Sequence, residues 1–219
     1  MPPRIALVHA LRASLAPIED AFAAAWPEAR LAHLLDDALP ADLERAGGVD
    51  ADLRRRFVAL ARYAVDAGAD AVLFTCSAFG SAIDGARDAV AVPVMKPNEA
   101  MVTAAVGGGR PLVLLATFAP TLPSMRPEFE AEAARQGRAL ELRLAHVPDA
   151  LAALQAGDAE RHDALVAEAA ARHADGATVV ALAQFSMARA APRVRAATGG
   201  TVLTTPDTAV AELRRRLGG

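Results

Sequence analysis

The chain has 219 residues, a formal net charge of −3 and a hydrophobic content of 53%. This balance argues against a surface built to hold nucleic acid or an anionic membrane, and an aromatic content of 4% is too low for platforms on which bases stack. The single cysteine cannot form an internal disulfide, which is typical of a reducing compartment. We find neither a secretory signal nor an apolar run long enough to cross a membrane, so we expect a cytoplasmic protein.

Short apolar runs alternate with amphipathic segments along the chain. Runs that are apolar at nearly every position are typical of strands that are covered on both faces of a parallel sheet. In chain order, the strands that we expect are 4–10, 70–75, 90–95, 111–117, 139–145, 178–184 and 200–205. Between them, segments such as "FVALARYAV" (57–65), which is followed by Gly68, predict helices. The alternation predicts an α/β fold.

The two halves of the chain match each other. The matching residues lie 107 positions apart at Ser14/Thr121 and Phe22/Phe129, 108 apart at Asp50/Asp158, Val58/Val166, Gly68/Gly176 and Val72/Val180, and 109 apart at Pro97/Pro206. The drift indicates two single-residue insertions. Because the matches follow the same order as the strand and helix patterns, they predict an internal duplication.

The duplication predicts two similar lobes, each a mainly parallel sheet flanked by helices. The first lobe comprises 1–97 together with 206–219, and the second comprises 98–205. In open parallel sheets, ligands bind beyond the carboxyl ends of the strands. We therefore expect the lobes to be related by a pseudo-dyad, with the site between them.

The stretch "AVLFTCSAFG" (71–80) places Cys76 directly after a strand and before a helix. Backbone N–H groups at a helix start favour an anion, so this position predicts a lowered thiol pKa. Thr75, Ser77 and the local N–H groups could hold a substrate carboxylate or a developing oxyanion. The alternative is that Cys76 packs as a small hydrophobic residue.

Further candidates stand at equivalent places in the chain. An offset of 108 places Gln184 at the position of Cys76, and Gln184 and Ser186 are predicted to bind the substrate carboxylate. His9 ends the first strand and is either an acid/base or carboxylate donor, or a hydrogen-bonded structural histidine. The other candidates, for which helix capping is an alternative at all but Thr117, are Ser14, Asn98, Thr117 and Thr121. The histidines show no metal-binding spacing, so we expect no metal site.

Two α/β halves with a Thr-Cys after a strand in the first half resemble the aspartate/glutamate/hydantoin racemase superfamily, whose relatives include maleate isomerase and arylmalonate decarboxylase. "VLLATFAPTLPSM" (113–125) and "VPVMKPNEAM" (92–101) are also similar to segments of that superfamily. The resemblance implies an enzyme that needs no cofactor, acts at a carbon next to the carboxylate of a small acid, and forms a homodimer. Racemases of the superfamily use one cysteine per half, one taking a proton while the other donates one. Cys76 matches the first cysteine, and Gln184 stands at the second position.

Neither Gln184 nor Ser186 has a pKa suited to carrying a proton. This departure leaves several alternatives to a two-thiol racemase. A decarboxylase needs one acid to protonate a carbanion, and a cis–trans isomerase can add a thiolate to a double bond. A binding protein without turnover and a thiol hydrolase that uses Cys76 with His9 are the remaining alternatives.

Overall fold

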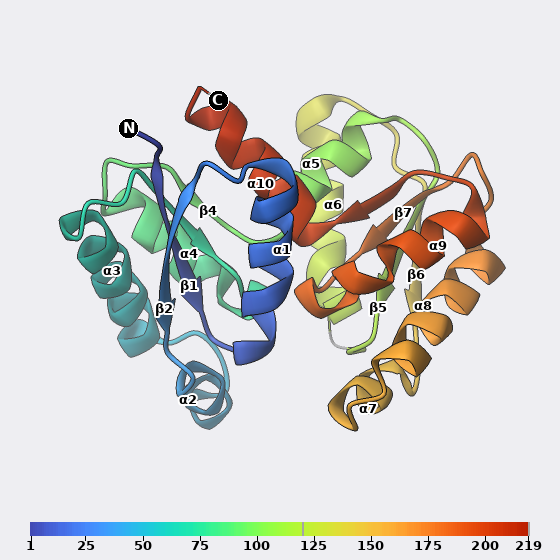
Figure 1. Ribbon diagram of the computed structural model, residues 1–219, viewed down its shortest axis with the longest axis horizontal. Coiled ribbons are helices and arrows are strands. Elements are labelled where there is room, and N and C mark those ends of the chain that lie inside the picture. Colours follow the sequence, from blue (N-terminus) through green and yellow to red (C-terminus); the bar gives the residue numbers. More distant parts are fainter. Residues whose placement is uncertain (120, 219) are drawn as a thin grey trace. The chain divides into compact units, whose positions relative to one another are not determined.

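A computed structural model describes residues 1–119 and 121–218, so Pro120 and Gly219 lie outside the described residues. The chain divides into two compact units, Met1–Pro97 with Ala209–Gly219, and Asn98–Thr208 (Figure 1). The sequence placed the second boundary at residue 205. In the structure it falls after Thr208, inside the helix α10 (Thr205–Arg216).

The first unit contains a four-stranded parallel sheet in the order β2-β1-β3-β4. Its strands are β1 (Arg4–His9), β2 (Arg30–Leu35), β3 (Ala71–Phe74) and β4 (Val94–Met95). Its helices are α1 (Leu15–Ala25), α2 (Leu39–Ala46), α3 (Ala51–Asp66) and α4 (Gly80–Asp88), with part of α10. Helices α3 and α4 pack their buried faces on one side of the sheet, and α1 lies on the other side (Figure 1).

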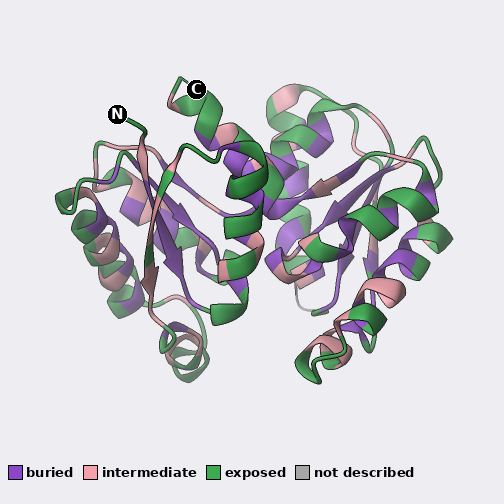
Figure 2. Cartoon of the chain, in the orientation of Figure 1, coloured by how far each residue is buried: buried purple, intermediate pink, exposed green. Residues whose placement is uncertain are grey.

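The second unit contains a sheet with the equivalent strand order, β6-β5-β7-β8, and it is also parallel. Its strands are β5 (Leu112–Ala116), β6 (Leu142–His146), β7 (Val179–Leu182) and β8 (Val202–Thr204). Its helices are α5 (Glu99–Gly107), α6 (Thr121–Gln136), α7 (Ala150–Gln155), α8 (Ala159–His173) and α9 (Ala191–Thr198). Helices α8 and α9 contribute to one buried cluster, and α5 and α6 to another. Figure 2 shows that the inner strands of both sheets are largely buried, while the outer faces of the helices are exposed.

The internal duplication extends to the strand register. Val72 pairs with Val94 in the first unit, and Val180 pairs with Val202 in the second, so both pairs are shifted by 108. This register means that residues which match in sequence also occupy the same place in each sheet. The expected α/β fold with two similar lobes is confirmed.

Side-chain roles are repeated as well. Phe22 and Phe129 are both buried, with 2% and 0% of their surface exposed. Asp50 caps α3 by accepting a hydrogen bond from a backbone N–H at 2.8 Å, and Asp158 caps α8 in the same way at 2.9 Å. The two units therefore use the same anchors for their helices.

Strand β2 was not predicted from the sequence. It lies at the edge of its sheet, where Arg30 and His33 are exposed and the other residues are only partly buried. Edge strands have one neighbour instead of two, so their sequences need not be apolar throughout. Strand β4 is shorter than predicted and begins after Pro93.

Among the described residues, none of the helices combines the length and apolar character needed to span a bilayer.

Candidate functional site

The thiol of Cys76 lies at the carboxyl end of the first sheet. Strand β3 ends at Phe74, and Cys76 has an extended backbone (φ −127°, ψ 121°) immediately before the 3-10 segment Ser77–Phe79. The side chain is partly buried against the core that α3 and α4 form with the sheet. Ser77 is exposed, whereas Thr75 is buried. The sulfur therefore packs on the core and still keeps some contact with the surface.

Burial controls the ionisation of this thiol. It raises the pKa of Cys76 above its ordinary value, because the thiolate loses more hydration than the thiol. A hydrogen bond from the backbone of Ala78 lowers the pKa by a smaller amount. The expectation of a lowered pKa was therefore wrong: the helix start provides an N–H donor, but desolvation outweighs it. At neutral pH, Cys76 is a protonated thiol.

His9 belongs to a chain of hydrogen bonds that starts at Thr75. His9 is fully buried; its Nδ1 lies 2.9 Å from Thr75 Oγ1 and its Nε2 lies 3.1 Å from His33 Nδ1. The two imidazole rings are stacked, with centroids 5.3 Å apart. Nε2 of His33 lies 3.4 Å from the Glu19 carboxylate, which is half-exposed on α1. The chain therefore leads from the end of β3 to the surface.

The chemistry of the partners fixes the proton order in this chain. The Glu19 carboxylate only accepts hydrogen bonds, so Nε2 of His33 carries a proton. With both rings neutral, His33 accepts from His9, and His9 accepts from the Thr75 hydroxyl. Burial, followed by the charge on His33, lowers the pKa of His9 to about 4. His9 is therefore neutral near pH 7, and both of its nitrogens are occupied.

Gln184 forms the equivalent junction in the second sheet. Its Oε1 accepts hydrogen bonds from the backbone N of Thr117 at 2.8 Å, the hydroxyl of Thr117 at 3.0 Å and the backbone N of Phe118 at 3.2 Å. Two backbone N–H groups require the oxygen to face them, so the amide NH₂ points elsewhere and can donate. Nε2 of His146 also lies 3.3 Å from the Thr117 carbonyl. Gln184 therefore ties the end of β7 to the end of β5.

Replacing Gln184 with alanine is expected to destabilise the protein by about 1 kcal/mol, because the part-buried backbone N–H of Thr117 loses its acceptor, while the exposed N–H of Phe118 can turn to water. Gln184→Glu keeps an oxygen at this place and should retain most of the stability. The free energy of unfolding in urea measures both changes. Gln155→Ala, at an exposed glutamine on α7, is the matched control and should have little effect. Equal stability of Gln184→Ala and wild type would contradict the assigned contacts.

The other predicted residues take different positions. Ser14 is buried and donates its hydroxyl to the Leu11 carbonyl at 2.9 Å, and Asn98 is buried with its amide 3.5 Å from the Met125 sulfur. Neither side chain caps the helix that follows, so the capping alternative is wrong for both. Thr121 is the first residue of α6 and Ser186 lies in the 3-10 segment Phe185–Ala190, and both are half-buried. The structure thus groups His9 with Thr75, next to Cys76, and Thr117 with Gln184.

Three charged or titratable residues near the carboxyl end of the first sheet were not predicted. His33 and Glu19 extend the hydrogen-bond chain of His9. Lys96 follows β4, and its Nζ lies 2.7 Å from the carboxylate of Asp84 on α4. His33 could not be found because its strand was missed.

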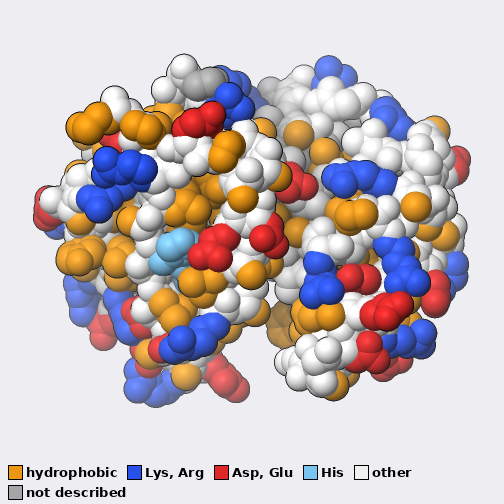
Figure 3. Space-filling model, viewed as in Figure 1, with side chains coloured by type: hydrophobic (Ala, Val, Ile, Leu, Met, Phe, Trp, Pro, Cys, Tyr) orange, Lys and Arg blue, Asp and Glu red, His pale blue; other side chains and the backbone are white. Residues whose placement is uncertain are grey.

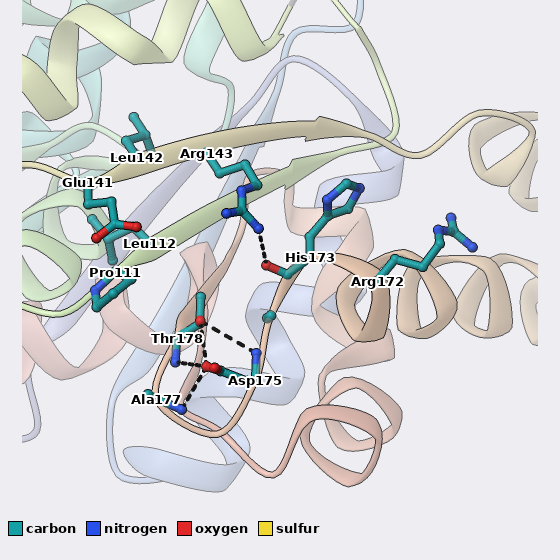
Figure 4. Close-up of a pocket in the computed structure, with 11 residues that line it drawn as sticks. Pro111, Leu112, Glu141, Leu142, Arg143, Arg172, His173, Asp175, Ala177 and Thr178 are labelled. Carbon is teal, nitrogen blue, oxygen red and sulfur yellow. Dashed lines mark hydrogen bonds between the residues drawn. The ribbon is translucent and has the colours of Figure 1, made fainter.

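A pocket of about 540 Å³ lies at the opposite, amino-terminal edge of the second sheet and contains no predicted site residue (Figure 4). Arg143 donates to the backbone carbonyl of His173 at 3.0 Å on its wall. The carboxylate of Asp175 accepts hydrogen bonds from Ala177 and Thr178 of its own turn. These polar groups hold the loop together.

On the molecular face seen in Figure 3, basic and acidic side chains are interspersed.

The strand order and the two polar junctions define an α/β protein built from a duplicated unit, with hydroxyl, thiol and amide groups at the carboxyl ends of its strands. A family model described as Asp/Glu/Hydantoin racemase matches residues 7–213. The chain belongs to this family, and the resemblance inferred from the sequence is confirmed. No curated protein sequence gives a significant match.

Solved structures with the same fold include several enzymes. Glutamate racemase from Bacillus anthracis is 14% identical with a TM-score of 0.71, over 99% of this chain and 82% of that chain. Allantoin racemase from Klebsiella pneumoniae is 21% identical with a TM-score of 0.65, over 99% of this chain and 89% of that chain. Arylmalonate decarboxylase is 17% identical with a TM-score of 0.56, over 99% of this chain and 93% of that chain. At these identities, the likeness shows the fold.

Proposed function

We propose that the chain is a cofactor-independent enzyme of the racemase type that acts at a carbon next to the carboxylate of a small acid, with Cys76 as its proton-carrying thiol. The observation that carries the proposal is the protonated, partly accessible thiol at the carboxyl end of the first sheet, in a chain of the Asp/Glu/hydantoin racemase family. The names of the structural neighbours, which include glutamate, aspartate and allantoin racemases, support a small acid or a related compound as substrate.

In exchange or racemisation, the thiolate form of Cys76 takes the proton from the carbon next to the carboxylate, and the thiol so formed returns a proton to that carbon. In decarboxylation, CO₂ leaves and the thiol donates the proton. Either step leaves negative charge that spreads onto the carboxylate oxygens that remain. Donors must hold this charge, and preorganised N–H and O–H groups do so best. We assign this role to the backbone and side chain of Ser77, which follows Cys76 in the same unit. His9 is assigned a positioning role, because its two nitrogens already contact Thr75 and His33. This arrangement argues against the thiol hydrolase, which needs a free imidazole nitrogen for the sulfur.

A second candidate is a decarboxylase that uses one thiol. It is favoured by the two residues at the matching sequence positions 76 and 184. The neutral Cys76 thiol can donate a proton, whereas the Gln184 amide cannot carry one. One proton carrier serves one face of a carbanion, whereas inversion of configuration requires proton transfer on both faces. Arylmalonate decarboxylase shares this fold.

Incubating the protein in D₂O with a panel of amino, dicarboxylic and substituted malonic acids tests the proposal. Proton NMR follows the Cα–H signal, polarimetry follows configuration, and a coupled assay follows CO₂. We expect deuterium to enter at the carbon next to the carboxylate. Loss of configuration identifies a racemase, whereas release of CO₂ with one product enantiomer identifies the decarboxylase. Binding of these acids without any exchange, isomerisation or CO₂ release would contradict the proposed enzyme and favour a binding protein.

A further inference from the structure

The pocket in Figure 4 is built by one unit alone. It has a volume of about 540 Å³, and its lining residues run from Pro111 to Thr178, all inside the unit Asn98–Thr208. It lies at the amino-terminal edge of β5, β6 and β7, the opposite edge from Gln184. Pockets for small organic molecules measure about 300–1,000 Å³, so its size suits such a ligand. The pocket shares no residue with the sheet that carries Cys76.

Two opposite charges stand on the same wall of this pocket without forming an ion pair. Glu141 directly precedes β6 and Arg143 is the second residue of β6, so the alternation of a strand places both side chains on one face. Arg143 instead donates to the backbone carbonyl of His173, which uses one of its five N–H groups. Figure 4 shows its guanidinium turned toward His173 and away from the Glu141 carboxylate. Within the part of the chain that the structure describes, the Glu141 carboxylate has no hydrogen bond or ion pair and is left to water or to a ligand.

A second acid and a second base complete the charges around the pocket. The carboxylate of Asp175 accepts its hydrogen bonds from Ala177 and Thr178 at Oδ1, which leaves Oδ2 as an acceptor. The hydroxyl of Thr178, followed by the backbone N–H groups, lowers the pKa of Asp175, so this carboxylate is charged. Arg172 and His173 form the end of the pocket that belongs to the last turn of α8 (Figure 4). Carboxylates and guanidinium groups therefore balance each other around the pocket.

This balance selects against a ligand that carries a single charge. An anion is attracted by the guanidinium groups but repelled by the carboxylates, and the reverse holds for a cation. A zwitterion offers a partner to each side, because its ammonium group can meet Glu141 while its carboxylate meets the unused N–H groups of Arg143. The buried Leu112 and the partly buried Leu142 add an apolar wall, which can cover an alkyl group and remove it from water.

We infer that this pocket is a binding site for a free α-amino acid with an apolar side chain. The amino acid lies with its ammonium group at Glu141, its carboxylate at Arg143 and its side chain on Leu112 and Leu142. The inference does not depend on the proposed function, because the pocket contains no residue assigned to that reaction.

Titration of the ¹⁵N-labelled full chain, followed by ¹H–¹⁵N NMR at neutral pH, tests the inference. The probes are leucine, 4-methylpentanoate, which lacks the ammonium group of leucine, and 3-methylbutylamine, which lacks its carboxylate. We expect leucine to shift the amide signals of Ala177 and Thr178, which line the pocket. Leucine should bind there about fivefold more tightly than either probe with a single charge, the effect of one partly exposed ion pair.

Variants of the two central charges assign the ends of the ligand. Glu141→Gln should abolish the advantage of leucine over 4-methylpentanoate, and Arg143→Gln should abolish its advantage over 3-methylbutylamine. Arg143→Lys keeps the positive charge and should retain most of the affinity. Arg161→Gln, at an exposed arginine in the first turn of α8, is the matched control and should leave every affinity unchanged.

Equal affinity for leucine and 4-methylpentanoate would indicate a site for simple anions and overturn the inference. A preference for leucine that survives in Glu141→Gln, or the absence of any shift at Ala177 and Thr178, overturns it as well. Shifts confined to Ser77 and its neighbours would place the amino acid next to Cys76, so the inference would fail while the proposed function stands. Shifts at Ala177 and Thr178 with the expected preference support the inference even if no acid exchanges Cα–H in D₂O.

Discussion

Replacing Cys76 with serine is expected to lower kcat/KM by about 10²–10⁴-fold, the range that one general acid or base contributes. Serine is similar in size and fits the partly buried position, but its hydroxyl ionises far less readily than a thiol. Initial rates of deuterium exchange or CO₂ release on the best acid of the panel measure the effect. Ser81→Ala, at an exposed serine on α4, is the matched control. Near-wild-type activity of Cys76→Ser would exclude the thiol mechanism.

The pH dependence of the same reaction shows which protonation state of Cys76 acts. Because burial raises the thiol pKa, the protonated form persists to higher pH than for an exposed cysteine. A thiol that acts as an acid predicts a rate that is level near neutrality and falls above this raised pKa. A thiolate that acts as a base predicts a rate that rises toward it. Exchange or racemisation therefore predicts the rising limb and decarboxylation the falling one, and in both cases we expect slow alkylation by iodoacetamide at neutral pH.

Much of the fold could be predicted because its strands are covered on both faces. Uninterrupted apolar runs such as those of β3 and β7 have few alternatives to a parallel sheet, and all of their residues are buried. The edge strand β2 carries no such signal, since its exposed Arg30 and His33 interrupt the apolar pattern. The repeat compensates in part, because a sheet in one half implies the same sheet in the other.

The candidate site could be located from sequence more easily than it could be described. The predicted strand ends placed Cys76, Thr117 and Gln184 at the carboxyl ends of the sheets. In the structure, Thr117 and Gln184 are joined by hydrogen bonds. The pKa of Cys76 depends on how completely the neighbouring helices remove water, which no local pattern records. The contact between His9 and His33 depends on the register of a strand pair whose second member was not predicted.

Burial of His9 is expected to make the protein lose stability as the pH falls below 7. The folded state holds the pKa of His9 at about 4, whereas an unfolded chain has the ordinary value of 6.5. Between these values the unfolded state binds a proton that the folded state refuses, so acid favours unfolding. The contribution of His9 is fully present above pH 6.5 and is lost as the pH falls to about 4. The difference in pKa corresponds to roughly 3 kcal/mol.

Urea unfolding at a series of pH values between 4 and 7.5 measures this loss as a change in the free energy of unfolding. His9→Gln removes the titrating ring, so its stability should vary much less across this range. His33→Gln removes the neighbouring positive charge, so the pKa of His9 should rise and the loss should become smaller. His173→Gln, at a partly exposed histidine on α8, is the matched control and should keep the wild-type slope.

The carboxylates act in a lower pH window and can be separated from His9. Hydrogen bonds from Arg135 lower the pKa of Glu132 to about 2, and Arg215 does the same for Glu212. Their contributions are present above the ordinary pKa of 4.5 and are lost as the pH falls toward 2. A loss of stability between pH 6.5 and 4.5 that is absent from His9→Gln therefore reports His9. If His9→Gln shows the wild-type slope in that interval, His9 is not the neutral, buried group that the hydrogen bonds to Thr75 and His33 require.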